Sequence, residues 1–567
     1  MHLDQTHFNL WTFLRNLWRI FWRKLGAIFP RRARITCSNC DADLWRARLF
    51  RDLRVCHNCG HHFPITARKR IALLMDRGAF QETEKDFAIK SFALSAQAAY
   101  PQLVRAAQHE THLREAVITG VGKIDNARAL FVVLDFNFMG GSMGAVVGEK
   151  IARAFEFAAA QKMPLVAFTA SGGARIQEGM LALMQMAKTT AAAQKFRAAH
   201  LPFITILTHP TTGGVYASFA NLADFIFAEP RALIGFAGPR VVEALTRQKL
   251  PPDSHHAEFL LEHGMIDAIV PRTEQRAHLA RILKMFTPST APKSEIENFS
   301  APEPTTRTAW EIVELARRAD RPTALDYIQK IFDDFIELRG DRFFGDDSAI
   351  VGGIASLNGQ TVIVIGQERG RGAARAQHRG GRAEPEGYRK AQRLMRLAAN
   401  LELPLITLVD TPGADPSYES EKRGVAMSIA HCLAAMIDLP VPTIAVVIGE
   451  GGSGGALALA AADRVLMLEH AIYSVISPEG ASAILYGDAQ RADQVAGILR
   501  LTARDLRALG IIDTILAEPR GGAHLDPEFA ARSVCAGIAH AFVNIGAARG
   551  DALKNARYEK YRRIGKM

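Results

Sequence analysis

Two stretches of this 567-residue chain match each other at a constant offset of 240 positions. Residues 163–174 (MPLVAFTASGGA) lie over residues 403–414 (LPLITLVDTPGA), and residues 202–207 (PFITIL) lie over residues 442–447 (PTIAVV). A repeat at a fixed period predicts two copies of one fold. Within each copy, apolar strands alternate with helical stretches, a pattern typical of a parallel sheet covered by helices on both faces. The sequence therefore predicts an α/β chain with two domains in tandem.

Each copy has two glycine-containing turns that follow predicted strands. Glycine lets the backbone approach a ligand closely, and unpaired N–H groups beside it can stabilise an oxyanion. A single turn of this kind is more typical of packing, but four turns paired by the repeat favour a functional site. Their residues are Ser171, Gly172, Gly173, Ala174, Gly213 and Gly214 in the first copy, and Gly413, Ala414, Gly454, Gly455 and Ala456 in the second. Asp410 and Glu450 beside them fit general bases and structural caps about equally well.

Four of the six cysteines form two Cys-x2-Cys pairs near the start of the chain, Cys37 with Cys40 and Cys56 with Cys59. Two such pairs offer four thiolates, which is the ligand set of a tetrahedral zinc site. Because four protein ligands leave no open coordination position, we interpret the site as structural. The arginines around the ribbon fit weak contact with nucleic acid or a solvated basic face.

Composition limits the partners and the compartment. Hydrophobic residues make up 48% and charged residues 22% of the chain, typical of a globular protein. The net charge of +11 favours anionic partners. No apolar run is long enough to span a bilayer, and the few cysteines suit a reducing cytoplasm. Residues 1–33 read as a basic amphipathic helix, which suits packing on a neighbouring subunit or a membrane interface.

A segment rich in proline, serine and threonine at residues 287–308 separates the two copies and indicates a linker. The predicted domains are therefore the helix at 1–33, the zinc ribbon at 34–62, the first copy at 63–286, the linker, and the second copy at 309–567. The second copy also contains a dense run of positive charge. Its members, Arg369, Arg371, Arg375, Arg379, Arg382, Arg389 and Lys390, fit an anion-binding site or a solvated loop.

Several strings in the chain are characteristic of one family. The paired cysteines, the strings at 138–144 (FMGGSMG), 171–175 (SGGAR), 183–189 (LMQMAKT) and 234–240 (IGFAGPR) resemble the β subunit of bacterial acetyl-CoA carboxylase carboxyltransferase. The strings at 385–391 (PEGYRKA), 410–414 (DTPGA), 449–456 (GEGGSGGA) and 474–480 (SVISPEG) resemble its α subunit. The resemblance extends from about residue 35 to the C-terminus, so the chain is similar to a fusion of β with α.

This resemblance implies two crotonase-like (ClpP/crotonase ββα superhelix) domains behind a small four-cysteine zinc ribbon. It implies transfer of a carboxyl group from carboxybiotin, held on a separate biotin carboxyl carrier protein, to acetyl-CoA, which gives malonyl-CoA for fatty acid biosynthesis. It assigns Gly172, Gly173 and Ala174 to the thioester oxyanion and Gly454, Gly455 and Ala456 to biotin. It further implies substrate contacts from Gly213, Gly214, Gly413, Ala414 and Arg175, a separate biotin carboxylase, and an oligomer, at least a dimer, with active sites between protomers.

The chain departs from the family pattern at residues 91–109, at 379–383 (RGGRA) and at 415–420 (DPSYES). These departures concern the substrate pockets and leave the predicted fold unaffected. Two alternative functions therefore stay open. One is a carboxyltransferase for another acyl-CoA such as propionyl-CoA, and the other is a non-catalytic, regulatory paralogue that binds RNA.

Overall fold

The structure is a computed structural model that describes residues 35–87, 99–251, 253–287 and 306–565. The chain divides into two compact units, Met1–Pro64 and Ile65–Met567. The predicted N-terminal helix at 1–33 and nearly all of the predicted linker at 287–308 lie outside the described residues. The domain boundaries given by the sequence therefore stay a prediction.

The first unit is a small ribbon with one described helix, α2 (Arg48–Leu53). Isolated bridges pair Thr36 with Asp43 and Val55 with His62, and each closes a loop that carries one cysteine pair. The apolar centre of this unit is very small, consisting of Cys37, Leu44, Phe50 and Cys56. Such a centre cannot stabilise a fold by hydrophobic burial alone, so the ribbon depends on its cysteines.

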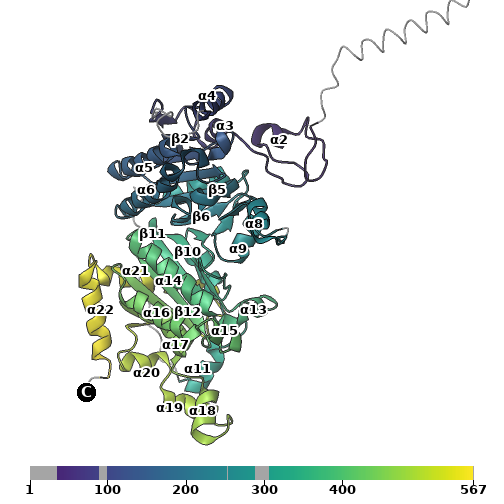
Figure 1. Cartoon of the computed structure of the whole chain (residues 1–567). Helices are drawn as coiled ribbons and strands as arrows, with labels where there is room; N and C mark the ends of the chain where they lie inside the picture. The colour runs from purple at the N-terminus through teal and green to yellow at the C-terminus, as the bar shows by residue number, and fades with distance from the viewer. Residues whose placement is uncertain (1–34, 88–98, 252, 288–305, 566–567) are drawn as a thin grey trace, which may run out of the picture. The chain divides into compact units, whose positions relative to one another are not determined.

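The second unit contains two eight-stranded sheets with the same topology (Figure 1). The first runs in the order β1-β2-β3-β4-β5-β6-β8, and the second in the order β9-β10-β11-β12-β13-β14-β16. In each sheet one edge is antiparallel and consists of the two strands of a hairpin and the outer strand that pairs with it. The other strands of each sheet pair in parallel. The sheets are thus mixed rather than purely parallel, because a two-residue turn joins the strands of each hairpin directly.

The strands of the first sheet are β1 (Gln81–Thr83), β2 (Val117–Ile124), β3 (Ala127–Leu134), β4 (Leu165–Ser171), β5 (Phe203–Thr212), β6 (Phe225–Ala228), β7 (Ile234–Gly235) and β8 (Ala268–Ile269). Those of the second are β9 (Asp334–Glu337), β10 (Ile350–Leu357), β11 (Gln360–Gln367), β12 (Leu405–Thr411), β13 (Thr443–Gly452), β14 (Arg464–Leu468), β15 (Ile472–Ser474) and β16 (Thr514–Leu516). The offset of 240 residues relates β4 to β12 and β5 to β13.

Both hairpins turn through two residues in the left-handed region. Asp125 and Asn126 have φ of 48° and 66°, and Asn358 and Gly359 have φ of 50° and 76°. Asn, Asp and Gly tolerate this conformation best, and its twist matches that of the flanking strands. The same local chemistry therefore begins both copies of the fold.

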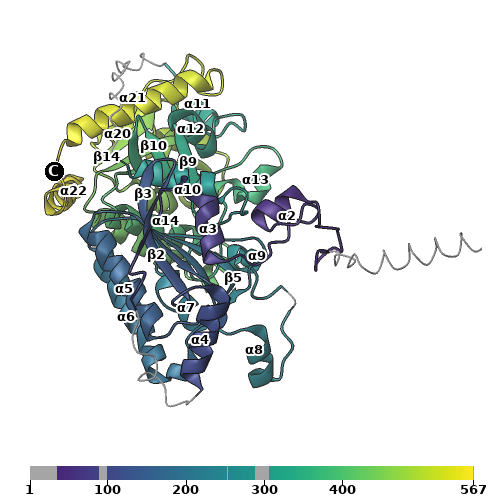
Figure 2. The same ribbon diagram turned by 90° about the horizontal axis from the view of Figure 1, so that it is seen from above.

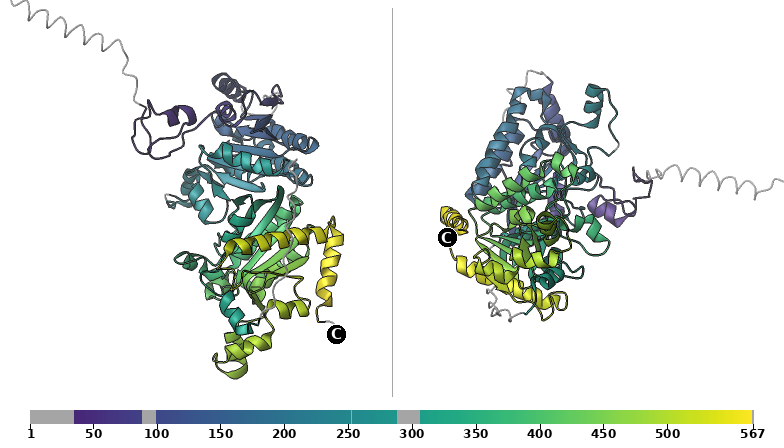
Figure 3. Two further views of the ribbon diagram at one scale, coloured as in Figure 1. Left: turned by 180° about the vertical axis from the view of Figure 1, so that it is seen from behind. Right: turned by 90° about the horizontal axis from the view of Figure 1, so that it is seen from below.

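Helices cover both faces of each sheet. On one face α5 (Ala145–Ala160) lies beside α6 (Met180–Arg197) in the first copy (Figure 2), and α14 (Pro385–Asn400) beside α16 (Val425–Ile437) in the second. The long helix α21 (Pro527–Ile545) crosses the opposite face of the second sheet (Figure 3). The α/β prediction is therefore confirmed.

The remaining helices are short connections and caps. They are α3 (Ala67–Leu74), α4 (Tyr100–Thr111), α7 (Gly213–Tyr216), α8 (Pro239–Thr246), α9 (Ala257–Glu262), α10 (Gln275–Met285), α11 (Ala309–Ala316), α12 (Ala324–Ile331), α13 (Ala374–Gln377), α15 (Tyr418–Lys422), α17 (Ser453–Ala460), α18 (Pro478–Tyr486), α19 (Ala492–Leu499), α20 (Ala503–Ala508) and α22 (Asp551–Arg563), with 3-10 turns η2 (Met139–Gly141), η3 (Ile176–Glu178), η4 (Phe219–Asn221) and η5 (Arg379–Gly381). Among the described residues, no helix combines the length and the hydropathy needed to cross a bilayer.

The two copies share one continuous hydrophobic core. At their junction the fully buried Asp267 of the first copy forms ion pairs with Arg342 at 2.7 Å and Arg393 at 3.0 Å of the second. The backbone also meets there, because the Arg342 amide donates to the Gly264 carbonyl at 3.0 Å. The halves are therefore joined within this chain by a buried, charged contact.

Candidate active site and metal centre

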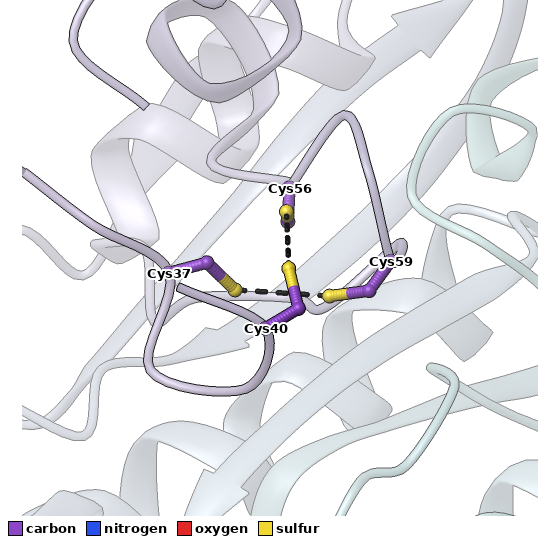
Figure 4. Close-up of side chains that lie close together, drawn as sticks. All are labelled: Cys37, Cys40, Cys56 and Cys59. Atoms are coloured by element: carbon purple, nitrogen blue, oxygen red, sulfur yellow. Dashed lines mark hydrogen bonds between the residues drawn. The ribbon is translucent and has the colours of Figure 1, made fainter. Parts of the chain in front are cut away.

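The four cysteines of the ribbon converge on one point (Figure 4). Their sulfurs all lie within 4.8 Å of one another, and the Cys37–Cys59 and Cys40–Cys56 pairs are each 3.7 Å apart. Four sulfurs at about 2.3 Å from a tetrahedral zinc ion would be separated by about 3.8 Å. The donor set and its spacing therefore fit the predicted zinc site.

The surrounding N–H groups also suit thiolates. The Asn39 and Asn58 amides donate to Cys37 Sγ and Cys56 Sγ at 3.4 Å, and the side-chain amide of Asn39 donates to Cys59 Sγ at 3.4 Å. This side-chain hydrogen bond is the main cause that lowers the pKa of Cys59 to about 6. Burial raises the pKa of Cys37 to about 11, so the cysteines differ in how readily they form the thiolate that binds metal.

In the first copy, the two predicted glycine turns meet at the ends of β4 and β5. Gly173 adopts φ +112° and Gly213 φ +60°, and a Cβ on Gly173 would lie 3.1 Å from Gly213 Cα. The Gly172 amide donates to the Gly140 carbonyl at 2.8 Å, which joins the first of these turns to η2. The structure therefore brings Gly172, Gly173, Ala174, Gly213 and Gly214 together, as the repeat predicts for a site at strand ends.

In the second copy, the corresponding turns meet at the ends of β12 and β13. Gly413 adopts φ +136°, and a Cβ on Gly455 would lie 2.6 Å from the Ala414 nitrogen. Ala456 follows as a fully buried residue of α17, while Gly454 is half-buried at the start of that helix. The predicted residues of the second copy are therefore also assembled in one place.

The two assemblies have the same backbone conformation. Residues 139–141 have φ of 48°, 67° and 62°, and residues 379–381 have φ of 49°, 60° and 85°. The Arg175 amide donates to the Met143 carbonyl at 3.0 Å, and the Asp415 amide donates to the Ala383 carbonyl at 2.9 Å. The segment at 379–383 that departs from the family pattern thus keeps the register of the first copy.

Each assembly presents unpaired backbone N–H groups. Within the part of the chain that the structure describes, neither the Ala174 amide nor the Ala414 amide donates to a protein acceptor. The Ala174 nitrogen lies beside Gly214, and the Ala414 nitrogen lies beside Gly455. Both glycines are among the first residues of the helix that follows the neighbouring strand. First-turn amides of a helix have no acceptor in that helix, so both places can receive an oxyanion.

Arg175 stands behind the first-copy turns and does not face solvent. Its side chain is fully buried, its guanidinium forms a bidentate pair with Glu115 at 2.6 and 2.8 Å, and it also donates to Ser142 Oγ at 3.1 Å. Burial opposes the charge of Arg175, yet the Coulombic attraction of Glu115 outweighs burial and raises the pKa of Arg175. These partners direct the donors of Arg175 toward the protein interior, and its contact with substrate stays a prediction.

Tyr100 and Glu178 complete this network and were missed by the sequence analysis. The Tyr100 hydroxyl donates to Glu178, whose other oxygen accepts from the Ala145 amide at 2.6 Å, at the start of α5. Both side chains are buried. Tyr100 lies in the 91–109 stretch that departs from the family, and its spacing from Glu178 provides no local signal.

A cavity of about 1240 Å³ lies beside the second-copy turns, where Pro412 and Ser453 line it. Its lining includes Pro412, Ser453, Glu450 and Glu479, an apolar side formed by Val475, Ile476 and Ile484, and the arginines Arg317, Arg369, Arg375, Arg379 and Arg382. The predicted run of positive charge is therefore divided between arginines that line the cavity and members that lie elsewhere. Arg389 and Lys390 are bound to Asp341, Glu386 and Asp346 elsewhere in the fold.

Asp410 and Glu450 form ion pairs with two arginines that line this cavity. Arg369 contacts Asp410 at 3.2 Å and Glu450 at 3.3 Å, and Arg317 contacts Glu450 at 2.8 Å. Burial raises the pKa of Asp410, although Arg369 acts in the opposite direction. Asp410 also accepts from the Glu450 amide at 2.9 Å, which favours its interpretation as a structural cap.

The chain has two crotonase-like domains in tandem behind a four-cysteine ribbon, and each domain has two glycine turns that present free amides. These features define a protein of the carboxyltransferase fold. A family model described as acetyl co-enzyme A carboxylase carboxyltransferase-like matches residues 293–565. Among solved structures, transcarboxylase 12S with methylmalonyl-coenzyme A and methylmalonic acid bound is 25% identical, with a TM-score of 0.68 over 84% of this chain and 90% of that one.

Curated relatives span both copies and the ribbon. The acetyl-coenzyme A carboxylase carboxyl transferase subunits beta/alpha of Natranaerobius thermophilus is 43% identical over 94% of this chain and 91% of its own length. The protein of the same name from Salinispora arenicola is 45% identical over 93% and 96%. This chain belongs to the family of acetyl-CoA carboxylase carboxyl transferases in which the beta and alpha subunits are fused.

Proposed function

We propose that this chain is the carboxyltransferase component of an acetyl-CoA carboxylase. It moves the carboxyl group of carboxybiotin, carried on a separate protein, to the methyl carbon of acetyl-CoA and produces malonyl-CoA, the building unit for fatty acid synthesis. The observation that carries the proposal is the duplicated assembly of glycine turns, with the same φ pattern and the same free amide in both copies. A reaction with two oxyanions needs two such sites.

The amides around Gly172, Gly173 and Ala174, with Gly213 and Gly214, receive the oxygen of the thioester. The amides around Gly454, Gly455 and Ala456, with Gly413 and Ala414, receive the ureido oxygen of biotin. The carboxyl group leaves the ureido nitrogen and joins the methyl carbon, and the methyl proton passes to that nitrogen. Preorganised donors stabilise the charge that develops on each oxygen without reorganising during the reaction.

The proposal requires no carboxylate base from the protein. Asp410 and Glu450, the two acids that the sequence offers as candidate bases, are held in ion pairs with Arg369 and Arg317. These ion pairs engage both carboxylates with arginines of the same chain, which suits a positioning role for the two acids. The protein therefore contributes binding, orientation and oxyanion stabilisation, and zinc contributes to the fold of the ribbon.

We also propose an oligomer, at least a dimer, in which the first copy of one protomer faces the second copy of another. Large apolar side chains are exposed immediately after the 171–175 turn, including Ile176 at 84% and Met180 at 64%. Exposed apolar surface of this kind indicates an interaction site. A light-scattering mass of a single chain at micromolar concentration would contradict this part of the proposal.

The test is malonyl-CoA formation from acetyl-CoA by the purified chain, supplied with a biotin carboxylase, a biotinylated carrier, ATP and bicarbonate. We expect turnover that depends on every component. A folded, zinc-loaded sample without turnover on any short acyl-CoA would refute the proposal. Salt-sensitive RNA binding by that inactive sample would instead favour the regulatory paralogue.

A second acceptor is favoured by one observation. The solved structure that is 25% identical holds methylmalonyl-coenzyme A, the carboxylated form of propionyl-CoA. Parallel measurement of kcat/KM for acetyl-CoA and propionyl-CoA separates the two acceptors. A ratio above 10 in favour of propionyl-CoA would replace acetyl-CoA as the assigned substrate.

A further inference from the structure

The strands that carry the second-copy turns are joined by a side chain close to those turns. Asp410, near the end of β12, accepts a hydrogen bond from the Glu450 amide of β13 at 2.9 Å. The strands approach closely there, because a Cβ on Gly449 would lie 2.5 Å from the Asp410 carboxylate. Ala414 follows four residues after Asp410, and Gly455 follows five residues after Glu450. The distance between the two turns therefore depends on this contact.

The same contact places two buried carboxylates beside one guanidinium. Arg369 Nη1 lies 3.2 Å from Asp410 Oδ1 and 3.3 Å from Glu450 Oε2, and all three side chains are buried. Glu450 has a second cation, Arg317 at 2.8 Å, whereas Asp410 has no other ion pair among the residues that the structure describes. Neighbouring buried carboxylates repel each other unless a cation compensates their charge. Arg369 is therefore the counterion on which this contact depends.

Packing holds Arg369 in place as well. A Cβ on Gly381 of η5 would lie 2.9 Å from Arg369 Cγ and 2.8 Å from the Asp410 carbonyl oxygen. The Gly381 carbonyl in turn accepts from Thr411 Oγ1 at 2.6 Å. The stem of Arg369 thus lies against η5, and its guanidinium reaches the ends of β12 and β13. One side chain therefore joins three segments of the second-copy assembly.

In the first copy, the corresponding strand ends are joined without charge. The positions 240 residues before the two carboxylates hold Ala170 and Pro210. Thr169 Oγ1 and Thr211 Oγ1 share a hydrogen bond of 2.9 Å there. A hydrogen bond between two hydroxyls requires no counterion. A change of charge at Arg369 should therefore act on the second-copy turns and leave those of the first copy in place.

We propose that Arg369 is a positioning residue for carboxyl transfer, which fixes the spacing of the second-copy turns by neutralising Asp410 and Glu450. The inference rests on the proposed function and adds a residue that acts through the turns. Without the guanidinium, the two buried carboxylates repel each other and the ends of β12 and β13 separate. The amides of both turns then lose the arrangement that stabilises an oxyanion, and a displacement of roughly 1 Å can cost about 100-fold in rate.

The test compares three variants of the full chain. Arg369→Gln removes the cation, Arg369→Lys keeps it, and Arg369→Gln/Asp410→Asn removes the cation together with its carboxylate partner. Asparagine keeps a side-chain oxygen that can accept from the Glu450 amide. The matched control is Arg371→Gln, which loses the same charge at an exposed position, where the guanidinium contacts Asp326. The assay is carboxylation of free biotin by malonyl-CoA, with thermal unfolding of every protein.

We expect the kcat of Arg369→Gln to fall by about 30-fold through displacement of the turns. The Kd for malonyl-CoA should stay within about 2-fold of the parent, because the proposed function assigns the thioester to the first copy. Arg369→Lys should lose less than about 5-fold in kcat, since it keeps the charge. The double variant should recover to within about 5-fold of the parent, because removing both charges also removes the repulsion. A residue that touches substrate would not be rescued in this way.

Three results would overturn the inference. Parental kcat in Arg369→Gln would show that the guanidinium does not set the spacing of the turns. A double variant as slow as Arg369→Gln would exclude the positioning role, and a raised KM for free biotin would then assign the guanidinium to the substrate. An equal loss in Arg371→Gln would show an effect of net charge alone.

The double variant also decides the case in which Arg369→Gln does not fold. A folded and active double variant would then support the inference, and any other behaviour of that variant would overturn it. Failure of the parent protein to carboxylate free biotin is a different result, since it would refute the proposed function itself.

Discussion

Gly455→Ala tests whether the second-copy turns depend on close approach of two backbones. A Cβ at this position would lie 2.6 Å from the Ala414 nitrogen and 2.8 Å from the Tyr388 hydroxyl, whereas ordinary contact begins at 3.4 Å. The Ala414 turn must therefore move by about 0.8 Å, and the buried Tyr388 ring behind it leaves little room. This movement displaces the free amide that we assign to the ureido oxyanion.

The expected effects on stability and on catalysis differ in size. Overpacking costs about 1–3 kcal/mol, and alanine in place of a helical glycine returns about 1 kcal/mol, so the free energy of unfolding should fall by only about 1 kcal/mol. A misplacement of roughly 1 Å at a catalytic group can cost about 100-fold in rate. The variant should therefore stay folded and lose most of its turnover.

The assay is carboxylation of free biotin by malonyl-CoA, followed beside urea unfolding. Gly497→Ala in α19 is the matched control, because a Cβ there meets nothing within 4 Å. It should keep parental turnover and gain up to about 1 kcal/mol of stability. Parental turnover in Gly455→Ala would refute the assignment of these amides to the reaction.

Three further predictions concern the ribbon, the buried network and acid stability. Cys37→Ser or Cys56→Ser should release zinc and unfold the ribbon, measured as metal content and protease sensitivity. Glu115→Gln should lower the free energy of unfolding by about 3 kcal/mol, because it removes the bidentate carboxylate of the buried Arg175 and leaves only Glu178 at 3.7 Å. Burial, assisted by Arg281, lowers the pKa of His278 to about 4, below the unfolded value of about 6.5. Stability should therefore be fully present above pH 6.5 and fall by up to about 3 kcal/mol toward pH 4.

Each of these predictions has a control and a contradicting result. Cys432→Ser, outside the cluster, should keep its zinc, and unchanged metal content in Cys37→Ser would remove that residue from the site. Parental stability in Glu115→Gln would show that the ion pair contributes nothing. His278→Phe keeps a ring against Phe227, 4.5 Å away, and should be less sensitive to acid. An identical pH profile would remove His278 from the acid response.

Local patterns in the sequence were sufficient for most of the fold and part of the site. Two residues separate the cysteines within each pair, and the glycine turns follow directly on their strands. Their geometry is therefore set by neighbouring residues, and the repeat doubles the evidence for each turn. The antiparallel edge of each sheet escaped this reasoning, although its turns at Asp125 and Asn358 carry a hairpin signal.

The partners of the charged side chains could not be predicted from the sequence. Arg175 matched a substrate-contact motif, yet its side chain turns away from the site to Glu115, 60 residues earlier. The arginine run at 369–390 looked uniform, but only Arg375 and Arg382 among its cavity-lining members keep an uncompensated charge in the part of the chain that the structure describes. Whether a charge is free depends on the acids that folding brings beside it.

The sequence by itself determined the repeat, the paired cysteines and the positions of the glycine turns, because each is encoded by residues close together in the chain. Only the tertiary structure decided which amides remain unpaired, which arginines are neutralised, and how Asp267 joins the two copies through Arg342 and Arg393. These properties depend on pairs separated by tens of residues or more. Burial strengthens such pairs and penalises any partner left alone, so the packed fold selects them.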